Sequence, residues 1–452
     1  MTIVLLRLKD RFAFCSVIFI FDLILRTLNP LMKNTFYNDF DVETLEKRNS
    51  DYRTPFQTDR DRIIHSFAFR RLQAKTQVFY SGEYDFYRTR LTHSMEVAQI
   101  GRSICNFLRK NCPRLSDEFH IDPDLVEAAC LSHDLGHPPF GHSGETILNR
   151  LMQPYGGFEG NAQTLRIITE TIYSRENRRT GMKPTRAFID SLLKYKVLFH
   201  QAEKPDKHFL YDQQKPFLDF VFANRSFPEK LAPEKALNSF RSVECEIMDW
   251  ADDTAYSLND MVDGIKTGFL NVPRIEKWAA LKTLGPEESK VLSAILDIIK
   301  KDGVEGLFGL KIGEFIMACE LEERETHIDD LTNRYRFHLI VNPGVLTECR
   351  LYKQISREIV FESPQLKQLE HKGHHMLKNI FHTYFSNYVK VEAPSLSLLP
   401  KDDELAITNL QHQETVQVRL LCDYIAGMTD RFAIRTFKRL FDPDFGSIVD
   451  LI

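Results

Sequence analysis

One stretch, Leu131–Glu145, constrains the fold more than any other part of the chain. Its three glycines and a Pro-Pro pair prevent a helix from running through it, so we expect a helix end followed by a tight loop. Three of the chain's 15 histidines fall within ten positions here. This density favours a metal or proton-transfer site over the alternative, a polar surface loop with structural histidines. The side chains that could serve such a site are His133, Asp134, His137, His142 and Glu145.

Helical patterns on either side can bring further polar groups to this stretch. Apolar residues recur with helical spacing from Val97 to Leu108, and His93 lies four residues before Val97, so it points inward from the first turn. A helix over 125–131 delivers His133 and Asp134 at its C-terminal end. A lone inward histidine is more often a hydrogen-bonded core residue, but the neighbouring candidate ligands favour a ligand role for His93.

A strong helical pattern covers residues 243–261. One face is apolar, while Asp252, Tyr256 and Asp260 repeat every four residues on a different face. In an isolated helix this acidic face would meet water. Beside a metal-binding loop it can supply the remaining carboxylate and a phenol.

Bulk composition excludes several classes of protein. Of the 452 residues, 43% are hydrophobic and 27% charged, which is typical of a globular protein. The net charge of -4 provides no overall attraction to nucleic acid, so phosphate must be bound by local basic patches. The 8 cysteines form no CxxC pair, which argues against a zinc ribbon or disulfide framework and fits a reducing cytoplasm.

The first 31 residues differ from the rest of the chain. Residues 12–25 are almost continuously apolar, but a membrane span needs about 20 residues. No small-residue cleavage site follows, as a signal peptide would require. We interpret residues 1–31 as an upstream extension, from a mis-called start or a poorly ordered arm, in preference to a membrane-associating segment.

The remaining chain is mostly helical in pattern. The clearest helical segments after residue 280 are 311–321 and 416–441, and a short strand is predicted at 337–341, before Asn342-Pro343-Gly344. Residues 174–186 form a basic, mobile loop that could grip phosphates, although a solvated loop is the simpler interpretation.

Two histidines and two carboxylates, from His93, His133, Asp134 and Asp252, would form a mononuclear metal site with open positions. A cation held there would polarise a phosphoryl group and lower the pKa of bound water. A histidine oriented by a carboxylate is a general acid/base pair. The residues therefore predict metal-assisted hydrolysis of a phosphoester or phosphoanhydride, without naming the substrate.

The pattern of His93, His133-Asp134 and Asp252 resembles the HD-domain superfamily. A closer resemblance, to bacterial deoxyguanosine triphosphate triphosphohydrolases, rests on seven motifs in order along the chain: Arg53–Ile63, Phe69–Val78, Thr89–Gln99, His133–Glu145, Phe158–Ile167, Ala251–Ser257 and Cys422–Ala433. It is thinner over 187–240 and 275–410, and residues 1–31 match nothing.

This resemblance implies an all-α fold: an HD-domain catalytic core over 32–275 and a C-terminal helical region over 276–452. It implies cleavage of dNTPs, with dGTP favoured, to deoxynucleoside and inorganic triphosphate. It also implies one divalent metal ion, Mg2+, Mn2+ or another transition metal. The ligands carried over are His93, His133, Asp134 and Asp252, with Asp252 preferred to Asp253 because it keeps the family's D-x3-Y-x3-D spacing.

Further roles follow from the same resemblance. His142, paired with Glu145, is the catalytic acid/base, and His137 contacts phosphate. Arg90 resembles the phosphate-binding arginine, Gln77 lies where the sugar 3′-hydroxyl is recognised, Tyr256 stacks beneath the deoxyribose, and Asp260 also faces the sugar. Candidate contacts to the base or to an allosteric ligand, which we cannot place, are Arg334, Tyr335, Lys353, His371 and Lys372.

The resemblance also brings a homo-oligomer, a dNTP activator and single-stranded DNA into consideration as partners, with no membrane. Two alternatives stay open. One is an HD-domain phosphohydrolase acting on another nucleotide, such as a 5′-nucleotidase or a cyclic-nucleotide phosphodiesterase. The other is a regulator that binds nucleotide or single-stranded DNA.

Overall fold

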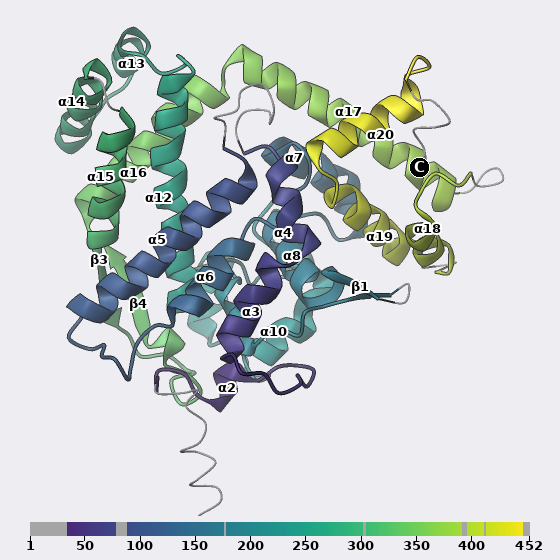
Figure 1. Ribbon diagram of the computed structural model, residues 1–452, viewed down its shortest axis with the longest axis horizontal. Helices are drawn as coiled ribbons and strands as arrows, with labels where there is room; N and C mark the ends of the chain where they lie inside the picture. Colours follow the sequence, from purple (N-terminus) through teal and green to yellow (C-terminus); the bar gives the residue numbers. More distant parts are fainter. Residues whose placement is uncertain are drawn as a thin grey trace, which may run out of the picture.

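Helices make up most of the protein, as the all-α prediction requires (Figure 1). The computed structural model describes residues 34–77, 88–175, 178–301, 304–390, 396–410 and 413–445. The helices of the first half are α2 (Asp39–Val42), α3 (Pro55–Ile64), α4 (Phe67–Arg71), α5 (Arg90–Asn111), α6 (Pro123–Ser132), α7 (Gly141–Met152), α8 (Gly160–Arg166), α9 (Arg186–Ser191), α10 (Lys215–Val221), α11 (Glu234–Ser239) and α12 (Val243–Lys266). Those that follow are α13 (Val272–Ala279), α14 (Pro286–Lys300), α15 (Val304–Met317), α16 (Pro343–Ile355), α17 (Pro364–Tyr388), α18 (Lys401–Thr408), α19 (Glu414–Ala426) and α20 (Asp430–Phe441).

The first hydrophobic core forms around α5, α6 and α12, which pack against one another. Helix α5 begins at a capping box in which Thr89 and Thr92 each accept a backbone N–H of the other, and it buries the predicted face from Val97 to Leu108. Helix α6 begins with Pro123 after the N-cap Asp122 and is almost entirely buried. Because this core packs all three helices together, the polar residues that they carry have fixed positions relative to one another.

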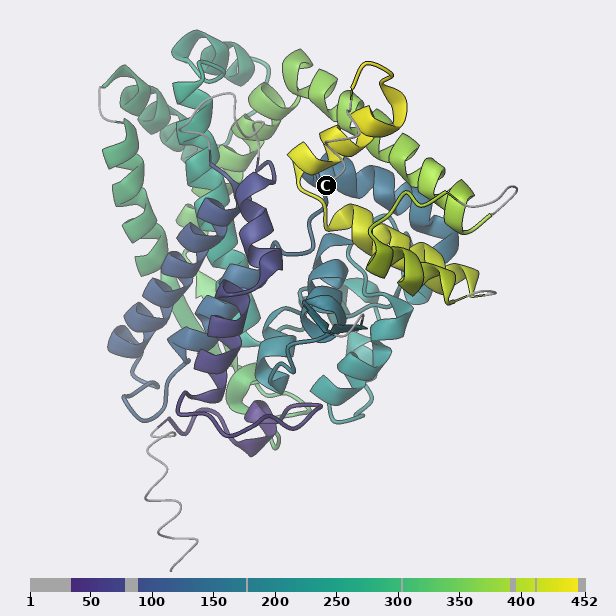
Figure 2. The same cartoon turned by 45° about the vertical axis from the view of Figure 1, so that its right-hand side comes forward.

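A second core joins α7 to the C-terminal helices. Phe140, Leu148 and Met152 pack there with residues of α17 and α19, among them Leu377 and Leu421. Helix α17 crosses the top of the molecule from the α13–α16 group to the group formed by α18, α19 and α20 (Figures 1 and 2). The stretch Leu131–Glu145 thus begins in the first core, with Leu131 and Leu135, and reaches the second core at Phe140.

Within the described ranges, strands are confined to two antiparallel pairs, β1 (Tyr173–Arg175) with β2 (Arg178–Thr180) and β3 (Cys319–Glu323) with β4 (Phe337–Val341). The strand predicted at 337–341 is confirmed. The helix predicted over 311–321 is wrong at its end, because α15 ends at Met317 and Cys319–Glu323 pairs with β4. The helix predicted over 416–441 is two helices, separated at residues 427–429.

Two predictions are not tested by the described residues. Residues 1–31, including the apolar segment at 12–25, lie outside the described residues. In the part of the chain that is described, no helix is both long and apolar enough to cross a membrane. The first core continues from Phe36 to Leu366, and the domain boundary at 275/276 stays a prediction.

Candidate active site

A cleft of about 570 Å³ opens where the two cores meet, within the usual range of about 300–1,000 Å³ for small-molecule sites. Most of the side chains expected to form a site line this cleft. They are Gln77, Arg90, His93, His133, Asp134, His137, His142, Glu145, Asp252 and Tyr256. The first turn of α5, the end of α6, the start of α7 and the middle of α12 thus converge on one space.

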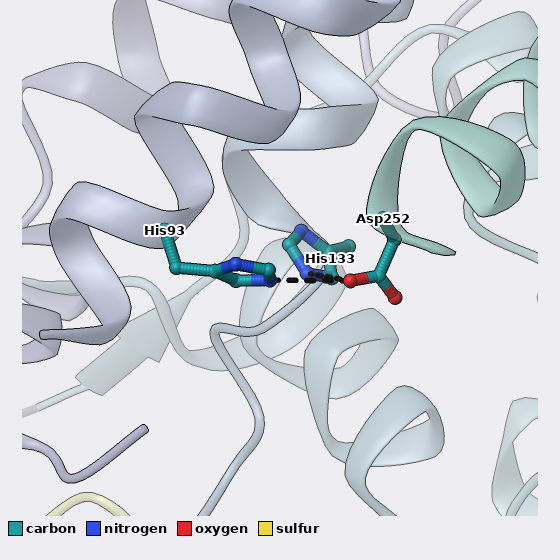
Figure 3. Close-up of side chains that lie close together, drawn as sticks. All are labelled: His93, His133 and Asp252. Atoms are coloured by element: carbon teal, nitrogen blue, oxygen red, sulfur yellow. Dashed lines mark hydrogen bonds and ion pairs between the residues drawn. The ribbon is translucent and has the colours of Figure 1, made fainter. Parts of the chain in front are cut away.

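Three candidate metal ligands that line the cleft point toward one another (Figure 3). The Nε2 atom of His93 lies 3.1 Å from Oδ1 of Asp252, and Nε2 of His133 lies 3.6 Å from the same oxygen. The three ligand atoms all lie within 4.8 Å of one another. Helices α5 and α12 and the C-terminal end of α6 each supply one residue, so packing of the first core brings the group together.

The donor set suits a divalent cation. His133 Nδ1 lies 2.6 Å from the carbonyl oxygen of Cys130, to which it can donate, leaving Nε2 as a lone-pair donor. That Nε2 is buried and has no hydrogen-bond partner within the described part of the chain. Ligand atoms about 2.1 Å from one cation are separated by about 3.0–3.4 Å, close to the spacings found here. Imidazole and carboxylate accept Mg2+, Mn2+, Fe2+ or Zn2+, so the group can hold a divalent metal whose identity is open.

Asp134, the fourth predicted ligand, faces a different set of partners. Its Oδ2 accepts a hydrogen bond of 2.6 Å from Arg90, and its Oδ1 lies 3.0 Å from Nδ1 of His137 and 3.5 Å from Nε2 of His133. Burial alone would raise the pKa of Asp134, but the charges of Arg90 and His137 lower it well below its ordinary value. Asp134 is therefore an ionised carboxylate. It lies beside the group of His93, His133 and Asp252, which we call the metal-type group.

A second polar group occupies the wall formed by α7. His142 Nδ1 lies 3.1 Å from Oε2 of Glu145, whose Oε1 accepts the backbone N–H of Gly160 at 2.7 Å. Burial would raise the pKa of Glu145, but the hydrogen bond to His142 and the nearby imidazole of His137 lower it to about 2. The carboxylate is thus ionised and holds one ring nitrogen of His142. The other nitrogen is left for a substrate, and 78% of the His142 side chain is exposed.

The tight loop predicted after His133 is shorter than expected. The loop ends at Phe140, and the last five residues of the stretch Leu131–Glu145 form the start of α7. Phe140 has φ 64° and Gly141 φ 57°, both in the left-handed region, which reverses the chain before the helix begins. His142 and Glu145 consequently lie one turn apart on a helix instead of in a loop.

The predicted sugar contacts separate into two sets. Gln77 lines the cleft, and its buried Oε1 has no hydrogen-bond partner among the described residues. Tyr256 also lines the cleft, and burial together with the nearby Asp260 carboxylate raises the pKa of its hydroxyl above the ordinary value. Asp260 itself is buried and is not part of the cleft wall.

Four cleft residues between α9 and α11 had not been predicted. They are Lys194, Tyr195, Lys207 and His208. Lys194 Nζ lies 3.0 Å from Asp249 and 3.2 Å from Oδ2 of Asp252, and the Tyr195 and His208 rings stack with centroids 4.3 Å apart. They lie in or next to an irregular segment rich in lysine, aspartate and proline, which shows no helical or strand period. The adjacent basic and aromatic residues Lys194-Tyr195 were therefore the one sequence feature that could have indicated a binding site here.

Part of the cleft wall is apolar. Phe361, Leu366 and Leu369 line it together with the carboxylate of Glu370, all from the turn into α17 and its first turns. Lys353, an unplaced candidate from the sequence, also lines the cleft and pairs with Asp253. His371 and Lys372 lie outside the cleft wall.

Two other unplaced candidates belong to the interior. The guanidinium of Arg334, which is 1% exposed, lies between Asp190 at 3.0 Å and Glu244 at 3.1 Å. The Tyr335 hydroxyl donates to Asp190 at 2.8 Å. Both side chains stabilise the packing of α9 against α12, and neither lines the cleft.

Comparison with known proteins assigns the chain to a family. An HD domain model matches residues 90–256, and a phosphohydrolase-associated domain model matches residues 339–439. The chain is 33% identical over 443 residues to a deoxyguanosinetriphosphate triphosphohydrolase-like protein of Shewanella loihica, covering 89% of this chain and 96% of that protein. A protein of the same name from Shewanella sediminis is 32% identical over 93% of this chain and 99% of its own length. The chain belongs to this triphosphohydrolase-like family of HD-domain proteins.

The family assignment confirms the resemblance found in the sequence and makes the protein an HD-domain phosphohydrolase. The HD domain match begins at Arg90 and ends at Tyr256, so it contains His93, His133 and Asp252. The phosphohydrolase-associated match contains Glu370 and most of the helices of the second core. The two matched regions thus meet at the cleft.

Proposed function

We propose that the protein hydrolyses deoxynucleoside triphosphates, with dGTP preferred, to deoxynucleoside and inorganic triphosphate. One observation carries this proposal: a single cleft joins a metal-type group, a histidine-carboxylate pair, several cations and an apolar end. A nucleoside triphosphate has matching parts, namely a scissile phosphoester, a polyanionic tail and a flat base. The names of the Shewanella relatives point to the same chemistry.

His93, His133 and Asp252 would hold the divalent metal, with Asp134 as the fourth ligand expected from the sequence. A metal bound there supplies electrophilic assistance, since it polarises the phosphoryl group and favours ionisation of an attacking water. Lys194 donates to Asp252 and fixes the orientation of its carboxylate. The donor atoms are in place before substrate arrives because three packed helices supply them.

His142 transfers a proton at the scissile bond. With Nδ1 directed to Glu145, its Nε2 is available to the substrate oxygen. The ionised Glu145 stabilises the imidazolium, which can give its proton to the 5′ oxygen as the bond to the α-phosphorus breaks. Cationic and hydrogen-bonding groups along the cleft neutralise and orient the phosphates: Arg90, His137, Tyr195, Lys207 and His208.

The sugar and base occupy the other half of the cleft. Tyr256 lies beneath the deoxyribose, and the amide oxygen of Gln77 accepts a hydrogen bond from the 3′-hydroxyl. The base lies among Phe361, Leu366 and Leu369. The Glu370 carboxylate can accept two hydrogen bonds from the N1–H and 2-amino group of guanine, whereas adenine has no matching pair of donors.

The proposal is tested by incubating the metal-loaded protein with each dNTP, alone and in pairs, and identifying products by chromatography. Release of inorganic triphosphate and deoxynucleoside is expected, fastest with dGTP. Orthophosphate released from a nucleoside monophosphate would instead favour a 5′-nucleotidase. Intact dNTPs in every combination would favour a binding regulator.

Base preference has its own test in Glu370→Gln. Because a bidentate pair is worth about 1–3 kcal/mol, the ratio of kcat/KM for dGTP to that for dATP should fall about 10-fold or more. Glu362→Gln is the matched control, since Glu362 also pairs with Lys367 but does not line the cleft. An unchanged ratio in Glu370→Gln would place the base elsewhere.

A further inference from the structure

One buried carboxylate in the C-terminal region binds two segments that border the cleft. Asp430, the first residue of α20, is 3% exposed. Its Oδ1 accepts the backbone N–H of Phe140 at 3.0 Å, and its Oδ2 accepts the backbone N–H of Thr76 at 2.8 Å together with the Thr76 hydroxyl. Thr76 and Phe140 both line the cleft. One side chain from the end of the protein therefore fastens two separate parts of the wall.

The loop end that Asp430 holds has an unfavourable conformation. Phe140 adopts φ 64° and ψ 22°, a region that bulky residues rarely occupy, and Gly141 follows with φ 57°. The first turn of α7 begins there, so the direction of His142 depends on this reversal. The Phe140 ring is held from the other side by α17, where a Cβ atom on Gly373 would lie 3.0 Å from the ring. The conformation is thus fixed by contacts from α17 and α20.

A buried lysine forms a second tie to the same C-terminal segment. Lys75 Nζ donates to the backbone carbonyl of His137 and, at 2.9 Å, to that of Ala426. Lys75 is 2% exposed. The segment from α19 to α20 carries the motif Cys422–Ala433, which the sequence singled out and the proposed chemistry does not use. This segment contacts Lys75, Thr76 and Phe140 but does not itself line the cleft.

We infer that Asp430 is a positioning residue, which fixes the left-handed turn at Phe140 and thereby aims His142 and Glu145 at the substrate. Lys75 supports the same turn at His137. The catalytic consequence of this inference rests on the proposed function. The contacts of Asp430 with Thr76 and Phe140, which we call the clasp, do not depend on it. Among the described residues, Asp430 and Lys75 form hydrogen bonds with Thr76, Phe140, His137 and Ala426, and none of these bonds goes to His93, His133 or Asp252.

The test compares two neighbouring substitutions in the full-length, metal-loaded protein. Asp430→Asn keeps the shape but replaces one acceptor oxygen by an N–H2 group, which would face a backbone or hydroxyl donor. Thr429→Ala removes the N-cap of α20, where Thr429 accepts the N–H of Phe432 at 3.2 Å, and leaves the clasp intact. Both should destabilise α20, so the melting temperature alone does not separate them.

In Asp430→Asn, kcat for dGTP should fall about 10- to 100-fold, because small misplacements of catalytic groups are costly. Bound metal should stay at the wild-type level, since neither carboxylate oxygen of Asp430 bonds to His93, His133 or Asp252. Amide hydrogen exchange over residues 137–145 should become about 10-fold faster or more. In Thr429→Ala, kcat and exchange of this loop should match the wild type.

If the amide hydrogens of residues 137–145 in Asp430→Asn exchange at the wild-type rate, the inference is wrong. An equal loss of kcat in Thr429→Ala would also overturn it, because helix stability would then explain the effect. If the wild-type protein hydrolyses no dNTP, the proposed function fails while the exchange measurement still decides the clasp.

Discussion

Two polar groups line the cleft, and they are built in different ways. His93 and His133 are 2% and 4% exposed, and they are held with Asp252 by three helices of the first core. In the second group, His137 precedes the left-handed residues Phe140 and Gly141, His142 and Glu145 lie in the first turns of α7, and the His142 side chain is 78% exposed. The difference fits the proposed roles, because a metal site needs fixed ligands and a proton-transfer group must reach the substrate.

The contrast extends to the parts of the chain that support each group. The metal-type group lies wholly within the region that matches the HD domain. The group of His137, His142 and Glu145 also lies there, but the turn at Phe140 is held by Asp430 and packed against α17, both in the region that matches the phosphohydrolase-associated domain. The second region thus supports part of the cleft wall that the first region forms.

The largest effect is expected from His133→Ala. Loss of one of the two buried imidazoles should weaken metal binding strongly and reduce dNTP hydrolysis to background, because the remaining His93, Asp134 and Asp252 include a single nitrogen ligand. Metal content by mass spectrometry and turnover should fall together. Full metal occupancy in this variant would show that the cation is held by other residues.

His142→Ala should separate the two groups. General acid/base groups contribute about 10²- to 10⁴-fold, so turnover should fall by that factor while metal content stays near the wild-type level. His200→Ala is the matched control. Its ring is also exposed and lies 2.7 Å from a carboxylate, that of Asp212, but it is outside the cleft. Metal loss in His142→Ala would make His142 a ligand and contradict the division.

The sequence predicted the parts of the site that depend on helical spacing. The inward direction of His93 followed from the apolar period of its helix, and it is 2% exposed. Asp252 was preferred to Asp253, and the structure brings Asp252 to His93 while Asp253 pairs with Lys353. The assignment of these residues as ligands stays a prediction, because proximity does not establish binding.

Sequence reasoning missed the parts that depend on contacts between distant segments. Asp430 meets Thr76 and Phe140 only after the C-terminal helices fold back over α7. Lys194 and Lys207 reach the cleft from irregular backbone with no period to interpret. The first three residues of the strand Cys319–Glu323 were predicted as helix, because the pairing of this strand with Phe337–Val341 overrides local preference.

Lys194→Met should give a smaller effect that concerns the metal-type group alone. The lysine donates to Asp252, and removal of such a supporting group weakens metal binding by about 10- to 100-fold. Methionine keeps the apolar stem, so packing is little changed. Metal affinity is measured by titration with a chelator, and turnover at saturating metal should recover most of its wild-type value. Affinity equal to the wild type would indicate that Asp252 is oriented without Lys194.

Lys196→Met provides the contrast two residues further on. Lys196 is 1% exposed, and its Nζ donates to the carbonyl of Leu193 at 2.9 Å. Burial lowers its pKa from 10.5 to about 8, although Asp190 acts in the opposite direction. The difference between these pKa values corresponds to about 3 kcal/mol, and the lost hydrogen bond costs about 1 kcal/mol. The substitution should therefore raise the free energy of unfolding at pH 7 by about 2 kcal/mol, with no change in metal affinity.

The sign of the pH dependence makes this last prediction specific. Below pH 8 the folded wild-type protein holds a charged, buried ammonium group. Between pH 8 and 10.5 the folded protein loses that proton while the unfolded chain keeps it, so wild-type stability rises with pH. The advantage of Lys196→Met, measured by urea unfolding, should shrink across this interval. A gain that does not vary with pH would mean that packing, not the buried charge, sets the cost of Lys196.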